Sequence, residues 1–80
     1  MSSLNNAFAL RLSKILKEKK MSKYRLEKLC GLTHTAMRNI FNGKSADLKF
    51  STIVKITNAL NITLGEFFTD KVFKIDFNAE

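Results

Sequence analysis

The sequence predicts an all-α fold, a compact domain of five short helices. Apolar residues recur at helical spacings of three and four along most of the 80-residue chain. Serine or threonine precedes several of these segments and glycine follows two of them, as at the ends of helices. The chain contains no proline that would interrupt a helix. Its hydrophobic content of 45% is normal for a folded protein, and its length allows one domain at most.

The first two helices follow from periodicity and caps. The first is expected over about residues 6–19, where one face is apolar. That face consists of Phe8, Leu12, Ile15 and Leu16. Ser22 can cap a second helix, which Gly31 ends because glycine adopts a left-handed backbone at little cost. The inward residues expected in this helix are Leu26, Leu29 and Cys30.

A third helix begins at a second cap, Thr33, and ends at Gly43. Its inward residues are expected to be Met37, Ile40 and Phe41. Two short helices joined by a turn that contains glycine are typical of a helix-turn-helix, here over about residues 22–43. The second helix of such a motif can enter the major groove of DNA.

Two further helices complete the predicted domain. The fourth could be capped by Asp47 or by Ser51, and the sequence leaves both alternatives open. Its buried side is expected to consist of Phe50, Ile53, Ile56 and Leu60. The fifth should occupy about residues 64–69, because the segment from Thr63 to Glu66 fits a capping box.

The last ten residues differ from the rest. Residues 1–70 are expected to form the domain, and residues 71–80 a tail in which apolar and polar residues alternate, which indicates a short β-strand. A strand needs a partner, so the tail could pair with a second copy of the chain, fold back onto its own domain, or fray. The residues expected at a dimer surface are Phe68, Phe73, Ile75 and Phe77.

Positive charge is concentrated in the first half of the chain. Residues 1–44 hold ten Lys or Arg and two acids, a net charge of +8. Residues 45–80 hold four Lys or Arg and five acids, a net charge of −1. A basic half that also contains the helix-turn-helix pattern indicates double-stranded DNA as the partner.

Several other classes of function are disfavoured by the sequence. It has no apolar run long enough to span a membrane and no signal peptide, so a cytoplasmic location is expected. The single cysteine, Cys30, and the single histidine, His34, match no zinc-site spacing, and no metal or cofactor is expected. The acids form no evident pair for acid–base chemistry, so the chain is not expected to be an enzyme. No small-molecule ligand is indicated.

With these features the chain resembles the Cro/phage-repressor-type (XRE-like) helix-turn-helix family over about residues 8–69. The resemblance depends on the order and spacing of short pieces, which include Arg11-Leu12, Met21-Ser22, Gly31-Leu32-Thr33, Asn42-Gly43-Lys44, Ala59-Leu60 and Glu66-Phe67-Phe68. It implies a lambda-repressor-like five-helix fold. It also implies sequence-specific DNA binding, usually by a dimer that regulates transcription.

The candidate site residues combine this resemblance with side-chain chemistry. Asn can bond adenine, Arg guanine, and Thr can touch a thymine methyl. The expected base contacts come from Thr33, His34, Thr35, Arg38 and Asn39, of which Thr33 could be simply a cap. The expected phosphate contacts come from Lys23, Tyr24, Asn42, Lys44 and Ser45. A dimer would then meet a palindromic operator with half-sites about 34–36 Å apart.

Two residues depart from the family pattern. Glu27 stands where members often have alanine, so either the helix crossing changes or Glu27 tilts outward while Leu29 fills the gap. Phe41 stands where members often have a glutamate that pairs with a first-helix arginine, which corresponds to Arg11. Phe41 is therefore expected to add core area, and Arg11 to be free for a phosphate or another acid.

Two other functions compete with the DNA-binding hypothesis. The fold could serve as a protein-interaction module, for example an antitoxin-like partner, without reading DNA. The basic first helix could also act as an amphipathic segment at a membrane surface. The second alternative is disfavoured because the apolar face of that helix is needed for the core.

Overall fold

The computed structural model describes residues 3–44 and 48–74. It contains α1 (Ser3–Lys19), α2 (Lys23–Cys30), α3 (His34–Phe41), α4 (Phe50–Ala59), α5 (Leu64–Phe67) and a 3₁₀ turn, η1 (Lys71–Phe73). No strand occurs in these two described ranges. The five-helix, all-α prediction is therefore confirmed.

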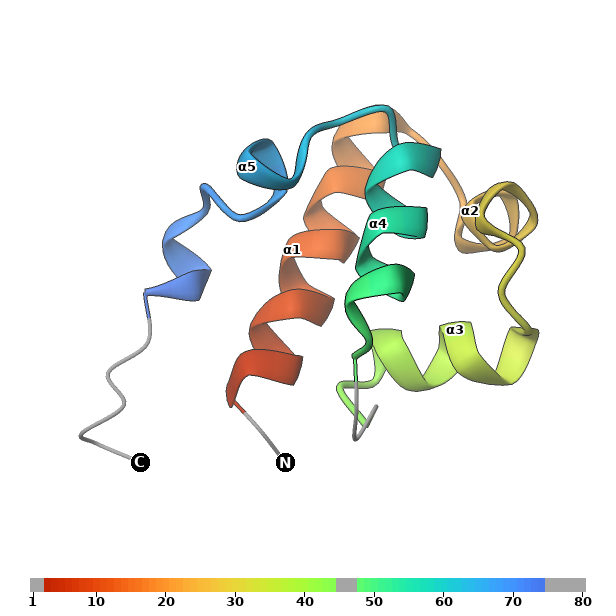
Figure 1. Ribbon diagram of the computed structural model, residues 1–80, viewed down its shortest axis with the longest axis horizontal. Coiled ribbons are helices and arrows are strands. Elements are labelled where there is room, and N and C mark those ends of the chain that lie inside the picture. The colour runs from red at the N-terminus through yellow and green to blue at the C-terminus, as the bar shows by residue number, and fades with distance from the viewer. Residues whose placement is uncertain (1–2, 45–47, 75–80) are drawn as a thin grey trace.

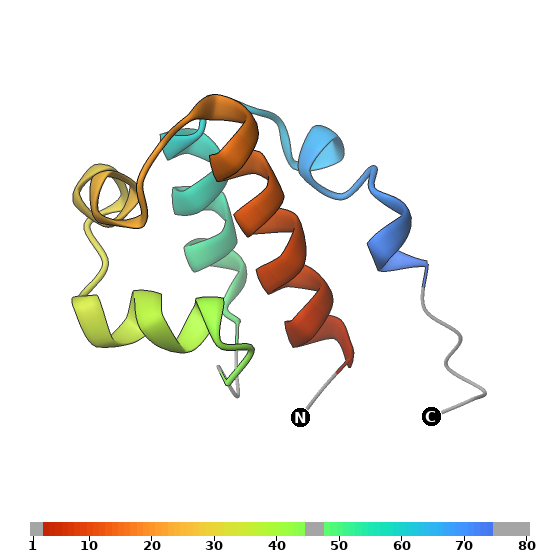
Figure 2. The ribbon, with the colours of Figure 1, turned by 180° about the vertical axis from the view of Figure 1, so that it is seen from behind.

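The helices are arranged around α1 and α4 (Figure 1). On one side of these two helices, α2 contacts α4 and α3, while α3 also contacts α1. On the other side, α5 contacts α4 and η1 contacts α1. The view from behind shows the same separation of the α2–α3 pair from α5 and η1 (Figure 2).

The core lies between these elements and includes the whole predicted apolar face of α1. Its buried members are Phe8, Leu12, Ile15, Leu16, Leu26, Cys30, Met37, Ile40, Ile56, Leu60 and Phe67. Two predicted core residues are instead exposed: Leu29 at 48% and Phe50 at 68%. At roughly 100° per residue, each lies about 80° from the centre of its helix's inward face, which explains both errors.

The predicted caps of α2, α3 and α5 are formed. Ser22 accepts a hydrogen bond from the amide of Arg25, and Thr33 accepts one from the amide of Ala36. The capping box of α5 is complete, because the side chains of Thr63 and Glu66 each accept the other residue's backbone N–H at 3.0 Å. These bonds satisfy amide groups that have no partner inside the helix.

The start of α4 differs from both expectations. Lys49 occupies the N-cap position and makes no side-chain capping bond. Ser51 lies inside the helix, so it is not the cap. Asp47, the other candidate, lies outside the described residues.

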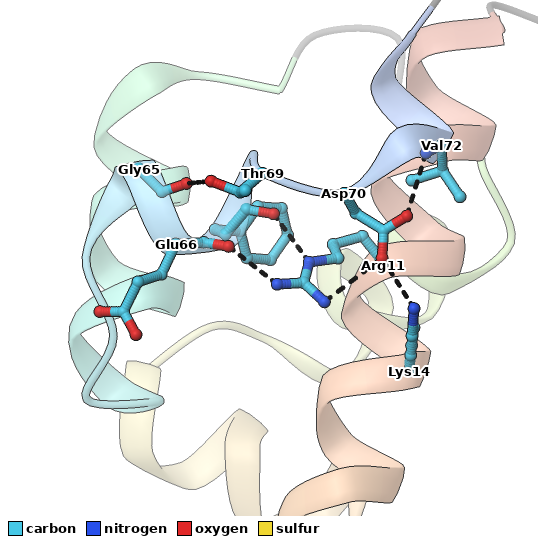
Figure 3. A network of polar contacts seen from close by, with 8 residues as sticks. Arg11, Lys14, Gly65, Glu66, Thr69, Asp70 and Val72 are labelled. Carbon is cyan, nitrogen blue, oxygen red and sulfur yellow. Dashed lines mark hydrogen bonds and ion pairs between the residues drawn. The ribbon is translucent and has the colours of Figure 1, made fainter.

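Arg11 connects α1 to the C-terminal part of the domain (Figure 3). Its guanidinium donates to the backbone carbonyls of Phe67 and Glu66, each at 2.8 Å, and lies 3.5 Å from Asp70 Oδ2. Lys14 approaches the same carboxylate oxygen at 2.9 Å. Arg11 is therefore not free for a phosphate. It does meet another acid, which was one of the two expectations.

The described part of the tail is a 3₁₀ turn rather than a strand. Asp70 caps this turn through the amide of Val72. The ring of Phe73 packs 4.8 Å from that of Phe68 and 6.0 Å from that of Phe67, between ring centroids. A compact turn satisfies its backbone locally and packs the half-buried Phe73 against the core, whereas an isolated strand would leave its backbone groups unpaired. Ile75 and Phe77 lie outside the described residues.

Candidate nucleic-acid interface

The turn between α2 and α3 holds the two helices across each other. In Figure 1, α2 is seen nearly end-on while α3 runs across the view. Gly31 has a φ of +71°, and its amide bonds to the carbonyl of Glu27 at the end of α2. The chain then becomes extended at Thr33, which starts α3. This local geometry is that of a helix-turn-helix.

One side of α3 is fixed to the core, and the other faces outward. Met37 and Ile40 are buried. The predicted base-contacting residues Thr33, His34, Thr35 and Arg38 are exposed, whereas Asn39 is half-buried. Four of the five polar candidates therefore lie on the open surface of one short helix and its cap. Thr33 also has the structural task of capping α3.

The predicted phosphate-contacting residues flank α3. Lys23 and Tyr24 lie in the first turn of α2 and are exposed. Asn42 and Lys44 follow α3 and are exposed as well, with the amide of Lys44 bonded to the carbonyl of Asn39. Ser45, the fifth candidate, lies outside the described residues.

A hollow of about 300 Å³ separates α2 from α3. Its lining consists of Lys23, Tyr24, Glu27, His34, Met37, Arg38 and Phe41. Phe41 is half-buried, so it is only partly a core residue, and the ammonium group of Lys23 lies 4.6 Å from the centroid of its ring. This cation–π contact keeps the lysine close to the surface between the two helices.

Glu27 makes a contact with His34 that was not predicted from the sequence. Its Oε1 atom lies 3.0 Å from Nδ1 of His34, and its side chain is 18% exposed. Glu27 therefore turns toward the start of α3. Leu29 does not fill a gap beneath it, because Leu29 is exposed. The signal available in the sequence was an acid at a usual alanine position of α2, with the only histidine of the chain at the start of the next helix.

Phe68 and Phe73, the two candidate dimer residues that the structure describes, belong to the segment of α5 and η1, which lies on the opposite side of α1 and α4 from α3 (Figure 2). Phe68 is 38% exposed and its ring packs 5.0 Å from that of Phe67. Phe73 is half-buried in the same aromatic cluster. Partly exposed aromatic rings therefore gather where α5 and η1 meet.

The described residues contain no group of three or more His, Cys, Asp or Glu side chains placed to hold a metal. Among the helices of residues 3–44 and 48–74, none has the length and apolar character that a membrane crossing requires.

Taken together, the crossed helix pair and the polar outer side of its second helix define a helix-turn-helix DNA-binding domain. The family model of the Cro/C1-type HTH DNA-binding domain matches residues 11–71, and the chain belongs to this family. The resemblance noted in the sequence is thereby confirmed. No curated protein and no solved structure matches the chain significantly.

Proposed function

We propose that the protein is a small transcriptional regulator, repressor-like and cytoplasmic, that reads double-stranded DNA through α3. The observation that carries the proposal is the two-sided character of this helix. Met37 and Ile40 fix it to the core, while His34, Thr35 and Arg38 are exposed on its outer side. A rigid helix with a polar outer face can place its side chains against base edges in the major groove.

The candidate residues then have two kinds of role. Arg38 can donate two hydrogen bonds to guanine and Asn39 can pair with adenine, while Thr35, His34 and the capping Thr33 lie within the same stretch. Lys23, Tyr24, Asn42 and Lys44 flank this stretch, and with Ser45 they would contact phosphates and fix the register of the helix. The net charge of +8 over residues 1–44 supports binding to a polyanion.

Residues 1–70 would form the DNA-binding domain, and the tail of residues 71–80 would assist dimerisation. Support comes from the exposed part of Phe68 and its aromatic neighbour Phe73, which lie away from α3. A two-fold dimer through this surface, with Ile75 and Phe77 as further candidates, would leave both copies of α3 free. Its operator would be palindromic, with half-sites about 34–36 Å apart.

Selection of bound oligonucleotides from a random pool, followed by sizing of the complex, tests this proposal. We expect a two-fold symmetric site occupied by two chains. Recovery of no preferred sequence would contradict specific reading. A tight protein partner together with no salt-sensitive DNA binding would support the interaction-module alternative instead.

A further inference from the structure

The pair formed by Glu27 and His34 joins the middle of α2 to the first residue of α3. The carboxylate is largely enclosed, with a side-chain exposure of 18%, whereas the imidazole is 77% exposed. The bond of 3.0 Å uses Nδ1 of the ring. Nε2, on the opposite edge of the ring, has no hydrogen-bond partner among the described residues. An anchored acid therefore holds an imidazole that faces outward from the start of α3.

We propose that Glu27 is a positioning residue for recognition, which makes His34 present Nε2 to the bases as a hydrogen-bond acceptor. This inference rests on the proposed function of α3. An ionised carboxylate only accepts hydrogen bonds, so the proton between the two groups belongs to Nδ1. In a neutral imidazole that carries its proton on Nδ1, the second nitrogen, Nε2, is a hydrogen-bond acceptor. The hydrogen bond between Nδ1 and Glu27 favours this Nδ1-protonated tautomer.

An acceptor at this place distinguishes amino bases from keto bases. In the major groove adenine offers its N6 amino group and cytosine its N4 amino group as donors. Guanine and thymine offer carbonyl oxygens instead, which would oppose the lone pair of Nε2. His34 should therefore favour adenine or cytosine on the contacted strand, at one position of each half-site. Every base pair has one amino group in the major groove, either on one strand or on the other. The contact with His34 therefore distinguishes the strand that carries the amino base from the strand that carries the keto base.

The tautomer can be tested on the full chain without DNA, because His34 is the only histidine. Long-range ¹H–¹⁵N spectra recorded over a series of pH values distinguish the neutral ring from the charged one and report which nitrogen of the neutral ring carries the proton. We expect Nδ1 in the wild type and a smaller Nδ1-protonated fraction in Glu27→Ala. Glu27→Gln keeps a side-chain oxygen that can accept the bond and should retain the wild-type pattern. An unchanged pattern in Glu27→Ala would overturn the inference.

The consequence for recognition is measured with operators that carry each of the four bases at the position affected by His34→Ala. The wild type should prefer the amino bases by about threefold to tenfold, the range of one hydrogen bond. Glu27→Ala should bring this ratio close to one, and Glu27→Gln should preserve it. Glu27→Ala and Glu27→Gln remove the same negative charge, so the general effect of that charge on DNA affinity should be the same in both. A difference in base preference between the two variants therefore does not come from the lost charge.

Besides unchanged spectra in Glu27→Ala, three results of the binding experiment would contradict the inference alone: a preference for keto bases at pH 8, no position affected by His34→Ala, or equal loss of preference in both Glu27 variants. Absence of any sequence-dependent binding by the wild type would instead overturn the proposed function, and this inference with it. The spectra without DNA keep the two failures apart.

Discussion

Gly31 and Gly43 hold similar positions at the ends of α2 and α3, but their surroundings differ. Both have left-handed backbones, with φ values of +71° and +67°. A Cβ atom at Gly31 would meet no atom within 4 Å, whereas one at Gly43 would collide with the side-chain oxygen of Asn6 on α1. Gly31 is therefore needed only for its backbone conformation. Gly43 also allows α1 to approach the end of α3.

Alanine at either glycine should lower the free energy of unfolding by about 1–2 kcal/mol, because an L residue is strained at positive φ. Gly43→Ala should be the more costly variant, since the Asn6 side chain must also move. Urea unfolding of both variants measures the difference. The additional loss of stability in Gly43→Ala, compared with Gly31→Ala, should disappear when Asn6 is also replaced by alanine. If this additional loss persists in the Asn6→Ala background, Asn6 is not its cause.

Asn39 and Lys44 are expected to contribute to DNA binding in different ways. Asn39→Ala should cost about 1–3 kcal/mol on the preferred operator and relax specificity at one base pair, because a bidentate contact to adenine is lost. Titration of operators that differ at single positions measures this effect. Equal weakening on every sequence would contradict a base contact by Asn39.

Lys44→Ala should weaken binding almost uniformly across sequences, because a phosphate contact carries no sequence information. It should also reduce the steepness of the salt dependence by about 0.9 in a plot of log affinity against log salt concentration. Lys17→Ala is a suitable control, since Lys17 is an exposed lysine of α1 that is not among the expected phosphate contacts. An unchanged slope in Lys44→Ala would remove Lys44 from the phosphate contacts.

At the scale of elements, α5 depends on groups at both of its ends. It has only four residues, too few to be stable as an isolated helix. The Thr63–Glu66 capping box holds its start, and the guanidinium of Arg11 binds the carbonyls at its end. The carboxylate of Asp70 then forms ion pairs with both Arg11 and Lys14, and these pairs fix the segment after α5 to α1 (Figure 3). This attachment positions the aromatic cluster of α5 and η1.

These contacts should make the domain less stable in acid. The hydrogen bond from Lys14 lowers the pKa of Asp70 below its ordinary value of 3.8, and the Thr63 amide lowers the pKa of Glu66 below 4.5. A lowered pKa in the folded state contributes stability that is complete above the ordinary value and is lost as the pH falls through the folded-state value. Urea midpoints measured from pH 7 to pH 2 should therefore decline below about pH 5.

Asp70→Asn should lower stability at neutral pH and flatten this decline, because the amide that replaces the carboxylate does not titrate. Glu18→Gln is the matched control, since Glu18 is exposed on α1 and has no partner of this kind among the described contacts. A decline as steep in Asp70→Asn as in the wild type would mean that other carboxylates cause it.

At the scale of the whole molecule, the aromatic cluster and the α2–α3 pair are separated. The α2–α3 pair and the cluster of Phe68 and Phe73 lie on opposite sides of α1 and α4 (Figures 1 and 2). The net charge is also divided, with +8 over residues 1–44 and −1 over residues 45–80. Two copies joined through α5 and η1 would therefore keep their α2–α3 pairs apart.

Phe68→Ala should weaken the proposed dimer by about tenfold, because a two-fold interface would bury the exposed 38% of two Phe68 side chains, and full burial of one such side chain contributes about 1.5–3 kcal/mol. Sedimentation equilibrium of the full chain measures this change. Leu29→Ala is the control, since Leu29 is exposed on α2, away from the cluster. Circular dichroism confirms that each variant is folded. A dimer of unchanged strength would place the interface elsewhere.

Local rules predicted most of the elements correctly. Ser22, Thr33 and Thr63 act as caps where the sequence expected them, because a cap bonds to amides only two or three residues away. Periodicity was less reliable at the edge of a helix face, as the exposure of Leu29 and Phe50 demonstrates. The polar outer side of α3 was also predictable, since the same spacing that buries Met37 turns its polar neighbours outward.

The sequence by itself determined the helices, the caps of α2, α3 and α5, and the family, because these depend on residues that are close along the chain. Only the tertiary structure decided the partners of residues that are far apart. Arg11 binds carbonyls 55 and 56 positions away, and the tail turns at η1 to place Phe73 against Phe67. The hydrogen bond between His34 and Glu27 likewise depends on how α2 and α3 cross. Such contacts form only after the helices have packed, because packing alone brings their side chains within reach.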